Sequence, residues 1–151
     1  MALISGLEPG PVALDTAPLI YYMEEDPKRL PIIAALFEAS SAGRFHLVTS
    51  SISLLEVLVL PLQKGYAGLA DRYREILVRS RQCTLIPVDS LVAQRAAMLR
   101  AKYGLRTPDA IHAATAWVTQ ATAFVTTDRS LAKVQEIPVV ILENIIVPRP
   151  A

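Results

Sequence analysis

Short apolar runs alternate along this chain with longer segments in which apolar residues recur at helical spacing. The short runs predict strands at residues 12–14, 46–49, 83–88, 123–126 and 139–142. The longer segments predict helices at residues 17–23, 30–41, 52–62, 68–80, 90–103 and 108–120. Because strands alternate with helices, the pattern predicts an α/β fold with a mainly parallel sheet.

End signals support several of the predicted helices. Gly43 and Gly104 each follow one, at the position where a glycine commonly ends a helix. Pro108 stands near the first position of the last helix, where its missing N–H is not needed. No internal repeat, low-complexity segment or long linker interrupts the pattern, so we expect a single domain.

Composition narrows the class of protein. The chain has 151 residues, of which 52% are hydrophobic, and a formal net charge of +1. This length suffices to bury one core without disulfides, and the small net charge means that any nucleic-acid binding must be local. Cys83 is the only cysteine, so a disulfide framework and a cysteine-based zinc site are excluded. We expect it to be a buried small hydrophobe in a reducing compartment.

No segment has the pattern of a targeting or membrane-spanning sequence. Residues 1–10 lack the basic and long apolar regions of a signal peptide. Of the two most apolar stretches, residues 45–63 are interrupted by Glu56 and residues 110–127 are rich in threonine. Both stretches are therefore typical of buried strands and helices. We expect a cytoplasmic protein that does not enter a membrane.

Four widely separated acidic residues fall where predicted strands pass into helices or turns. They are Asp15 after the first strand, Glu56 about one turn past the second, Asp109 at the start of the last helix and Asp128 after the fourth strand. Open α/β folds bind ligands at the carboxyl ends of their strands. Carboxylates gathered there repel one another unless cations or protons offset their charge, and all-oxygen ligands suit Mg²⁺ or Mn²⁺.

Each acid also has a purely structural explanation. Asp15 can cap the following helix, Asp109 suits the positive end of a helix dipole, and Asp128 can hold a turn. Glu56 has the fullest such explanation, because Ser53 and Glu56 have the Ser-x-x-Glu spacing of a capping box. The functional interpretation therefore rests on the set and its order.

The acids lie within four short motifs. These are Leu14-Asp15-Thr16, Ser51-x-x-x-x-Glu56, Thr107-Pro108-Asp109-Ala110-Ile111-His112-Ala113-Ala114-Thr115-Ala116 and Phe124-Val125-Thr126-Thr127-Asp128. Together they resemble the PIN-domain nucleases, and most closely the ribonuclease toxins of VapBC-type toxin–antitoxin pairs. The resemblance covers about residues 11–143. It implies a three-layer PIN-like fold, with a mainly parallel five-stranded sheet flanked by helices, in one domain over residues 1–151.

The same resemblance implies a function. It points to a Mg²⁺- or Mn²⁺-dependent endoribonuclease that hydrolyses phosphodiester bonds of single-stranded or structured RNA, with a cognate antitoxin and a homodimer as partners. The implied metal-binding and catalytic residues are Asp15, Glu56, Asp109 and Asp128, with Asp15 and Asp109 on the primary ion. Thr126 matches a catalytic hydroxyl position. Thr16 lies directly after the first acid, and the resemblance favours direct involvement in the site less for Thr16 than for Thr126.

Residues beside the acids leave two interpretations open. His112 lies one helical turn after Asp109 and can reach the same face, but its alanine and isoleucine neighbours favour a packing role. Arg106 and Arg129 flank Asp109 and Asp128, and each fits contact with phosphate as well as it fits an ordinary solvated side chain.

Other function classes fit the sequence less well. Phosphatases of the haloacid-dehalogenase type require Asp-x-Asp after the first strand, and Asp15-Thr16-Ala17 lacks the second acid. A receiver domain requires paired acids after the first strand and an aspartate after the third, which are also missing. The remaining alternative is a non-catalytic PIN-like module that binds RNA or protein, although such a module would usually have lost one or more of the acids.

Overall fold

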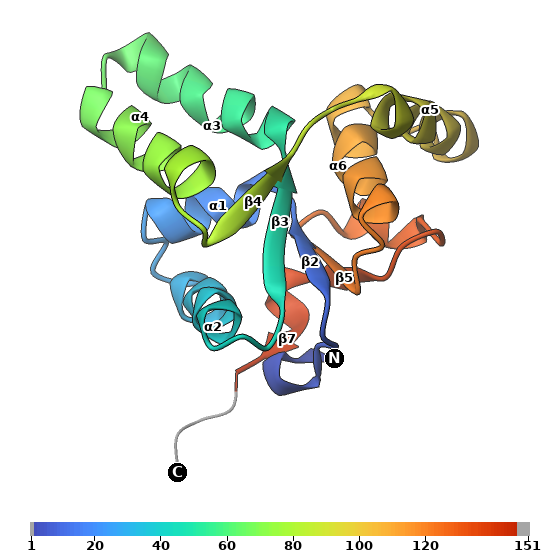
Figure 1. Cartoon of the computed structure of the whole chain (residues 1–151), viewed down its shortest axis with the longest axis horizontal. Coiled ribbons are helices and arrows are strands. Elements are labelled where there is room, and N and C mark those ends of the chain that lie inside the picture. The colour runs from blue at the N-terminus through green and yellow to red at the C-terminus, as the bar shows by residue number, and fades with distance from the viewer. Residues whose placement is uncertain (1, 148–151) are drawn as a thin grey trace.

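A five-stranded parallel sheet between two layers of helices forms the centre of the computed structural model, which describes residues 2–147 (Figure 1). The strands are β2 (Pro11–Leu14), β3 (His46–Ser50), β4 (Cys83–Ile86), β5 (Ala123–Thr126) and β6 (Val139–Ile141). They lie in the order β4-β3-β2-β5-β6, and every neighbouring pair is parallel. The predicted α/β class and parallel five-stranded sheet are confirmed.

Helices provide most of the crossover connections that parallel strands require. They are α1 (Thr16–Met23), α2 (Leu30–Ser41), α3 (Ser51–Lys64), α4 (Ala67–Arg74), the π-helix η2 (Glu75–Arg79), α5 (Ser90–Tyr103) and α6 (Thr107–Val118). Three short 3-10 helices are η1 (Ile4–Gly6), η3 (Arg129–Lys133) and η4 (Leu142–Asn144). None of the helices within residues 2–147 has the length and apolar character needed to cross a membrane.

Both faces of the sheet are buried. Val12 and Leu14 of β2 point to the face that α1 to α4 cover, whereas Ala13 between them points to the face that α5 and α6 cover. This alternation is the period of two that a strand imposes on its side chains. Because both sets must be apolar, the central strands read as continuous apolar runs in the sequence.

Two parts of the structure differ from the prediction. The segment expected as one helix over residues 68–80 is divided into α4 and η2, where the Ser80 N–H donates to the Glu75 carbonyl five residues earlier at 2.8 Å. A second parallel sheet pairs β1 (Ala2–Leu3) with β7 (Ile145–Ile146). Two-residue strands are too short for hydrophobic periodicity to reveal them.

Cys83 is buried in β4, as the sequence predicts, with 2% of its surface exposed. Burial raises the pKa of its thiol to about 12, so the thiolate is scarce in the folded protein at pH 8. We expect a thiol reagent such as DTNB to react with the native chain at least about 100-fold more slowly than with the unfolded chain, since the thiolate is the nucleophile. Rapid native-state reaction at pH 8 would contradict this burial.

The same shift has a defined sign in stability. The unfolded thiol ionises near pH 8.5, whereas the folded thiol ionises near pH 12. Cys83 therefore lowers the free energy of unfolding as pH rises through this window.

Candidate functional site

The candidate site lies at the carboxyl edge of the sheet, where the strand order reverses. The chain proceeds from β2 to β3 and β4 on one side and returns to β5 and β6 on the other. Leu14 of β2 is in register with Thr49 of β3 and Val125 of β5. The next residues, Asp15 and Thr126 among them, therefore meet at the switch point where open α/β sheets bind ligands.

Asp15 is tied to the neighbouring strand through both its backbone and its side chain. Its N–H donates to the Val125 carbonyl at 2.9 Å, and the Thr126 hydroxyl donates to its Oδ2 at 2.7 Å. Its Oδ1 accepts from the Thr16 N–H at 2.8 Å, so Asp15 also caps α1. The capping and site interpretations are thus compatible, because each uses a different carboxylate oxygen.

Thr126 connects two of the candidate acids. Its side chain is fully buried, and its hydroxyl accepts from the Asp128 N–H at 3.1 Å while donating to Asp15. The Asp128 side chain turns to its own loop, where Oδ1 accepts from the N–H and the hydroxyl of Ser130 at 2.9 and 2.7 Å. Asp128 therefore caps η3, as its turn interpretation predicts.

Glu56 is held by a group of buried polar side chains. Its Oε1 is 3.0 Å from the donating Thr16 hydroxyl and 2.7 Å from His112 Nε2. Thr16 also lies 3.0 Å from His112 Nε2 and 3.4 Å from the Ser53 hydroxyl. Thr16 is thus in direct contact with the acidic site, although the sequence motifs favoured its involvement less than that of Thr126.

The capping-box interpretation of Ser53 and Glu56 is wrong. Ser50, not Ser53, is the N-cap of α3 and accepts from the Ile52 N–H at 3.2 Å. Ser53 is fully buried, and its hydroxyl lies 2.7 Å from that of Thr49. The Glu56 side chain is therefore free to face the sheet edge, because the helix end is satisfied without it.

His112 packs within α6, as the sequence favours, and it also contacts the candidate site. His112 is 2% exposed among the alanines of α6, as packing requires. However, its Nε2 atom contacts Glu56 and lies 3.7 Å from Asp15 Oδ1. The one-turn spacing from Asp109 was the available signal for this contact.

These contacts affect the charge of Glu56. The hydrogen bond from His112 lowers the pKa of Glu56 most strongly, partial burial acts in the opposite direction, and the Thr16 hydrogen bond and the charge of Arg106 lower it further. Glu56 is therefore a carboxylate at neutral pH.

Arg106 lies among the remaining acids. Its Nε donates to Asp109 Oδ2 at 3.0 Å, while 80% of its side chain is exposed. The pKa of Arg106 is raised, chiefly by the Asp109 hydrogen bond and also by the negative charges of Asp128 and Glu56. The guanidinium thus partly offsets the field of three carboxylates and remains accessible from solvent.

The predicted residues are only partly brought into contact. Asp15, Glu56 and Thr126 are linked through short polar contacts, whereas Asp109 and Asp128 are engaged by Arg106 and Ser130. Across residues 2–147, no three Asp, Glu, His or Cys side chains are grouped closely enough to hold a metal ion. Arg106 forms an ion pair with Asp109. Within residues 2–147, Arg129 forms no such pair with an acidic side chain.

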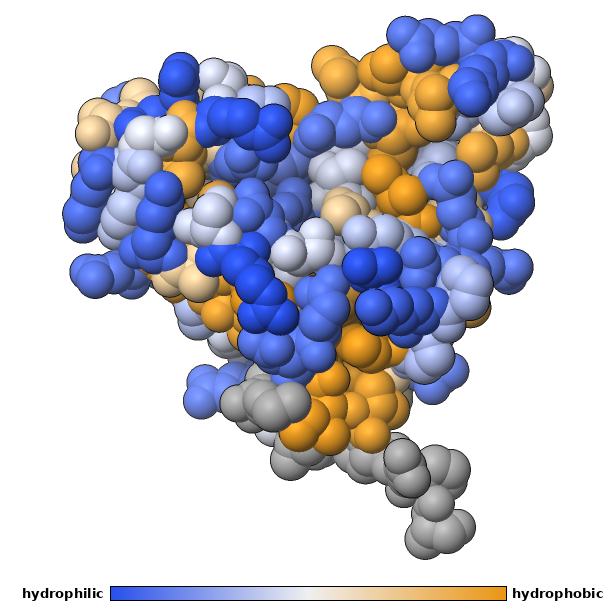
Figure 2. All heavy atoms as spheres, turned by 180° about the vertical axis from the view of Figure 1, so that it is seen from behind, coloured by the Kyte–Doolittle hydropathy of each residue, from blue (hydrophilic) through white to orange (hydrophobic). Residues whose placement is uncertain are grey.

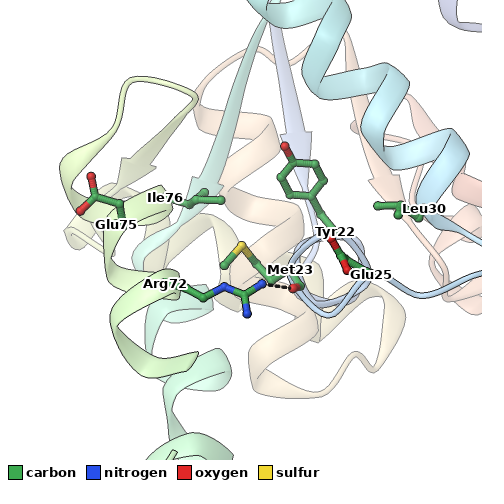
Figure 3. Close-up of a pocket in the computed structure, with 7 residues that line it drawn as sticks. All are labelled: Tyr22, Met23, Glu25, Leu30, Arg72, Glu75 and Ile76. Carbon is green, nitrogen blue, oxygen red and sulfur yellow. Dashed lines mark hydrogen bonds between the residues drawn. The ribbon is translucent and has the colours of Figure 1, made fainter. Parts of the chain in front are cut away.

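A separate hollow of about 320 Å³ lies between the end of α1, the start of α2 and the helices α4 and η2 (Figure 3). There the Arg72 guanidinium donates to the Met23 carbonyl at 2.9 Å, and Tyr22 and Ile76 supply apolar walls. The residues that line this hollow include none of the four acids. It is therefore distinct from the candidate site.

Solved structures with the same fold include toxin–antitoxin assemblies. VapBC2 from Rickettsia felis, bound to a promoter DNA fragment, has 17% identity and a TM-score of 0.71, over 87% of this chain and 98% of that chain. A toxin–antitoxin complex from Klebsiella pneumoniae has 25% identity and a TM-score of 0.64, over 83% and 94% of the two chains. DNA-bound VapBC from Salmonella typhimurium has 17% identity and a TM-score of 0.65, over 89% and 98%.

Two further comparisons concern the sequence. A comparison with curated proteins gave no match. The family model described as the PIN domain matches residues 12–137, a range that contains β3, β5 and all four candidate acids. This match and the shared three-layer architecture confirm the resemblance seen in the motifs: the chain belongs to the PIN-domain family.

Proposed function

We propose that this protein is a metal-dependent endoribonuclease and the toxin of a toxin–antitoxin pair. The observation that carries the proposal is the linked placement of Asp15, Glu56 and Thr126 at the switch point of the sheet, in a chain of a nuclease family. Asp109 and Asp128 come from the adjacent α6 and the end of β5 and complete the acidic edge.

The donor set fits a hard divalent cation. Asp15, Glu56, Asp109 and Asp128 offer only carboxylate oxygens, which Mg²⁺ and Mn²⁺ prefer. These four residues would hold the cation once Asp109 and Asp128 exchange their bonds to Arg106 and Ser130 for it. When bound, such a cation supplies a Lewis acid that lowers the pKa of water and offsets charge on the scissile phosphate.

The surrounding residues have defined tasks in this proposal. The Thr126 hydroxyl fixes the orientation of the Asp15 carboxylate, and Thr16 does the same for Glu56. The exposed guanidinium of Arg106, next to Asp109, is placed to contact an RNA phosphate that approaches the acidic edge. No side chain need act as a covalent nucleophile, since water fills that role.

In this proposal the protein binds a cognate antitoxin and forms a homodimer. It would act in the cytoplasm, where its RNA substrate lies. VapBC assemblies among the similar structures support an antitoxin. Exposed apolar side chains on α3, including Leu55, Val59 and Leu62, supply a surface that a partner would cover. Figure 2 shows apolar atoms on the lobe that α3 and α4 form, at the upper right of that view.

One observation favours a second candidate, a non-catalytic module that binds RNA or protein. Within residues 2–147 the acids do not form a ready metal cluster, and Asp109 and Asp128 are occupied by protein partners. Such a module would bind RNA through Arg106 and its neighbours without cutting it.

Metal removal separates the two candidates. We expect the purified chain to cleave RNA in Mg²⁺ or Mn²⁺, and EDTA to reduce the rate by at least about 100-fold, with full recovery on adding excess Mn²⁺. The cleavage products should carry 5′-phosphate ends, to be mapped by sequencing of the RNA ends. Cleavage that persists in EDTA would contradict metal dependence, and RNA binding without cleavage would favour the module.

A further inference from the structure

His112 is the one charged or titratable side chain among the buried residues of α6. Ala110, Ala113 and Ala114 around it are fully buried, and His112 itself is 2% exposed. A histidine buried in an alanine-rich helix must find hydrogen-bond partners, because an unpaired polar group away from water is costly.

All the polar contacts of His112 are made by one ring nitrogen. Nε2 lies 2.7 Å from Glu56 Oε1 and 3.0 Å from the Thr16 hydroxyl, whereas Nδ1 is buried and has no partner among the described residues. The Thr16 hydroxyl has a single hydrogen, which it donates to Glu56. At 2.7 Å a bare Nε2 lone pair would face a carboxylate lone pair, so we place the ring proton on Nε2.

This geometry joins the two helix layers. Glu56 lies on α3 and Asp109 on α6, and these helices stand on opposite sides of the sheet edge (Figure 1). His112 is one turn past Asp109 on α6, and its bond to Glu56 spans the layers. The position of one candidate acid is thereby coupled to the helix that carries another.

We propose that His112 is a positioning residue for the Glu56 carboxylate. Its Nε2–H and the Thr16 hydroxyl both bind Oε1, which fixes the side chain and leaves Oε2 available to a ligand. This proposal rests on the proposed nuclease function. Partners that orient a metal-binding carboxylate typically change metal affinity or activity by about 10- to 100-fold when removed.

Three substitutions test the proposal. The amide nitrogen of His112→Gln reaches about as far as Nε2, that of His112→Asn reaches only as far as Nδ1, and His112→Leu keeps the volume without a donor. We expect His112→Gln to stay within about 5-fold of wild-type kcat for RNA cleavage. His112→Asn and His112→Leu should lose about 10- to 100-fold in kcat, with a KM for RNA close to wild type.

Mn²⁺ binding, measured by calorimetry on folded protein without RNA, supplies a second readout. We expect His112→Leu to weaken Mn²⁺ binding about 10-fold or more, and to have no further effect once Glu56 is replaced by Gln. Thermal unfolding identifies any variant that fails to fold. If His112→Leu does not fold, the Mn²⁺ titration is made with His112→Asn instead.

The two proposals fail in different ways. A wild-type chain that binds Mn²⁺ without cleaving RNA overturns the nuclease function, while the Mn²⁺ titrations still decide the role of His112. If the wild type cleaves RNA and His112→Leu does so equally well, or if His112→Gln is as impaired as His112→Leu, the positioning role is overturned alone. The positioning role is also overturned if the wild-type chain does not bind Mn²⁺.

Discussion

If the proposed function holds, we expect replacement of Asp15 by Asn to reduce RNA cleavage by about 1,000-fold or more while the fold is retained. Asn has nearly the shape of Asp and is an equally good helix N-cap, so the start of α1 keeps its hydrogen bond. What is lost is one negative charge at the centre of the proposed cation site, together with the carboxylate oxygen that accepts from the Thr126 hydroxyl.

Single-turnover cleavage in saturating Mn²⁺ measures this effect, and thermal unfolding verifies the fold. Asp71→Asn is the matched control, because Asp71 lies on α4 with 68% of its side chain exposed and, within residues 2–147, pairs only with Arg74. That variant should cleave RNA at the wild-type rate. Asp15→Asn with a rate within 10-fold of wild type would contradict the assignment of Asp15 to the metal site.

Replacement of Phe124 by Ala is expected to lower the free energy of unfolding by about 3–5 kcal/mol. Phe124 is fully buried on β5, where it packs in the layer formed with α5 and α6. Removal of the ring leaves a cavity in a close-packed interior that relaxes only partly. Because a domain of this size is stable by only about 5–15 kcal/mol, a substantial part of its stability is at stake.

Urea unfolding followed by circular dichroism measures this change. Leu62→Ala on α3 is the control, since Leu62 is 58% exposed and its truncation should change stability by no more than about 0.5 kcal/mol. A loss of less than about 1 kcal/mol for Phe124→Ala would show that the layer under α6 is less tightly packed than the structure indicates.

The sequence predicts the frame of the fold well, because its signals are local. The helices α2 and α5 begin and end where predicted, at Leu30–Ser41 and Ser90–Tyr103. Gly104 ends α5 in the left-handed conformation, with φ of 68°, which explains why it is a reliable stop signal. The apolar runs of the central strands are equally local consequences of burial on both faces.

The arrangement of the site is less accessible to sequence, because its contacts are distant along the chain. His112 and Glu56 are 56 positions apart, and no spacing rule relates them. Ser50, Ser51 and Ser53 offer several candidate N-caps, and only the observed helix start identifies Ser50. The bonds of Asp109 to Arg106 and of Asp128 to Ser130 likewise depend on rotamers, which composition and periodicity do not fix.

The bond between Thr126 and Asp15 spans 111 positions of the chain. A nascent polypeptide on the ribosome carries Asp15 and Glu56 early, but it lacks Thr126, the partner of Asp15 Oδ2, until β5 has emerged. The chain must therefore be translated through β5 before the acidic edge exists. For the ribonuclease proposed above, this order of synthesis would keep each molecule inactive until β5 has been made.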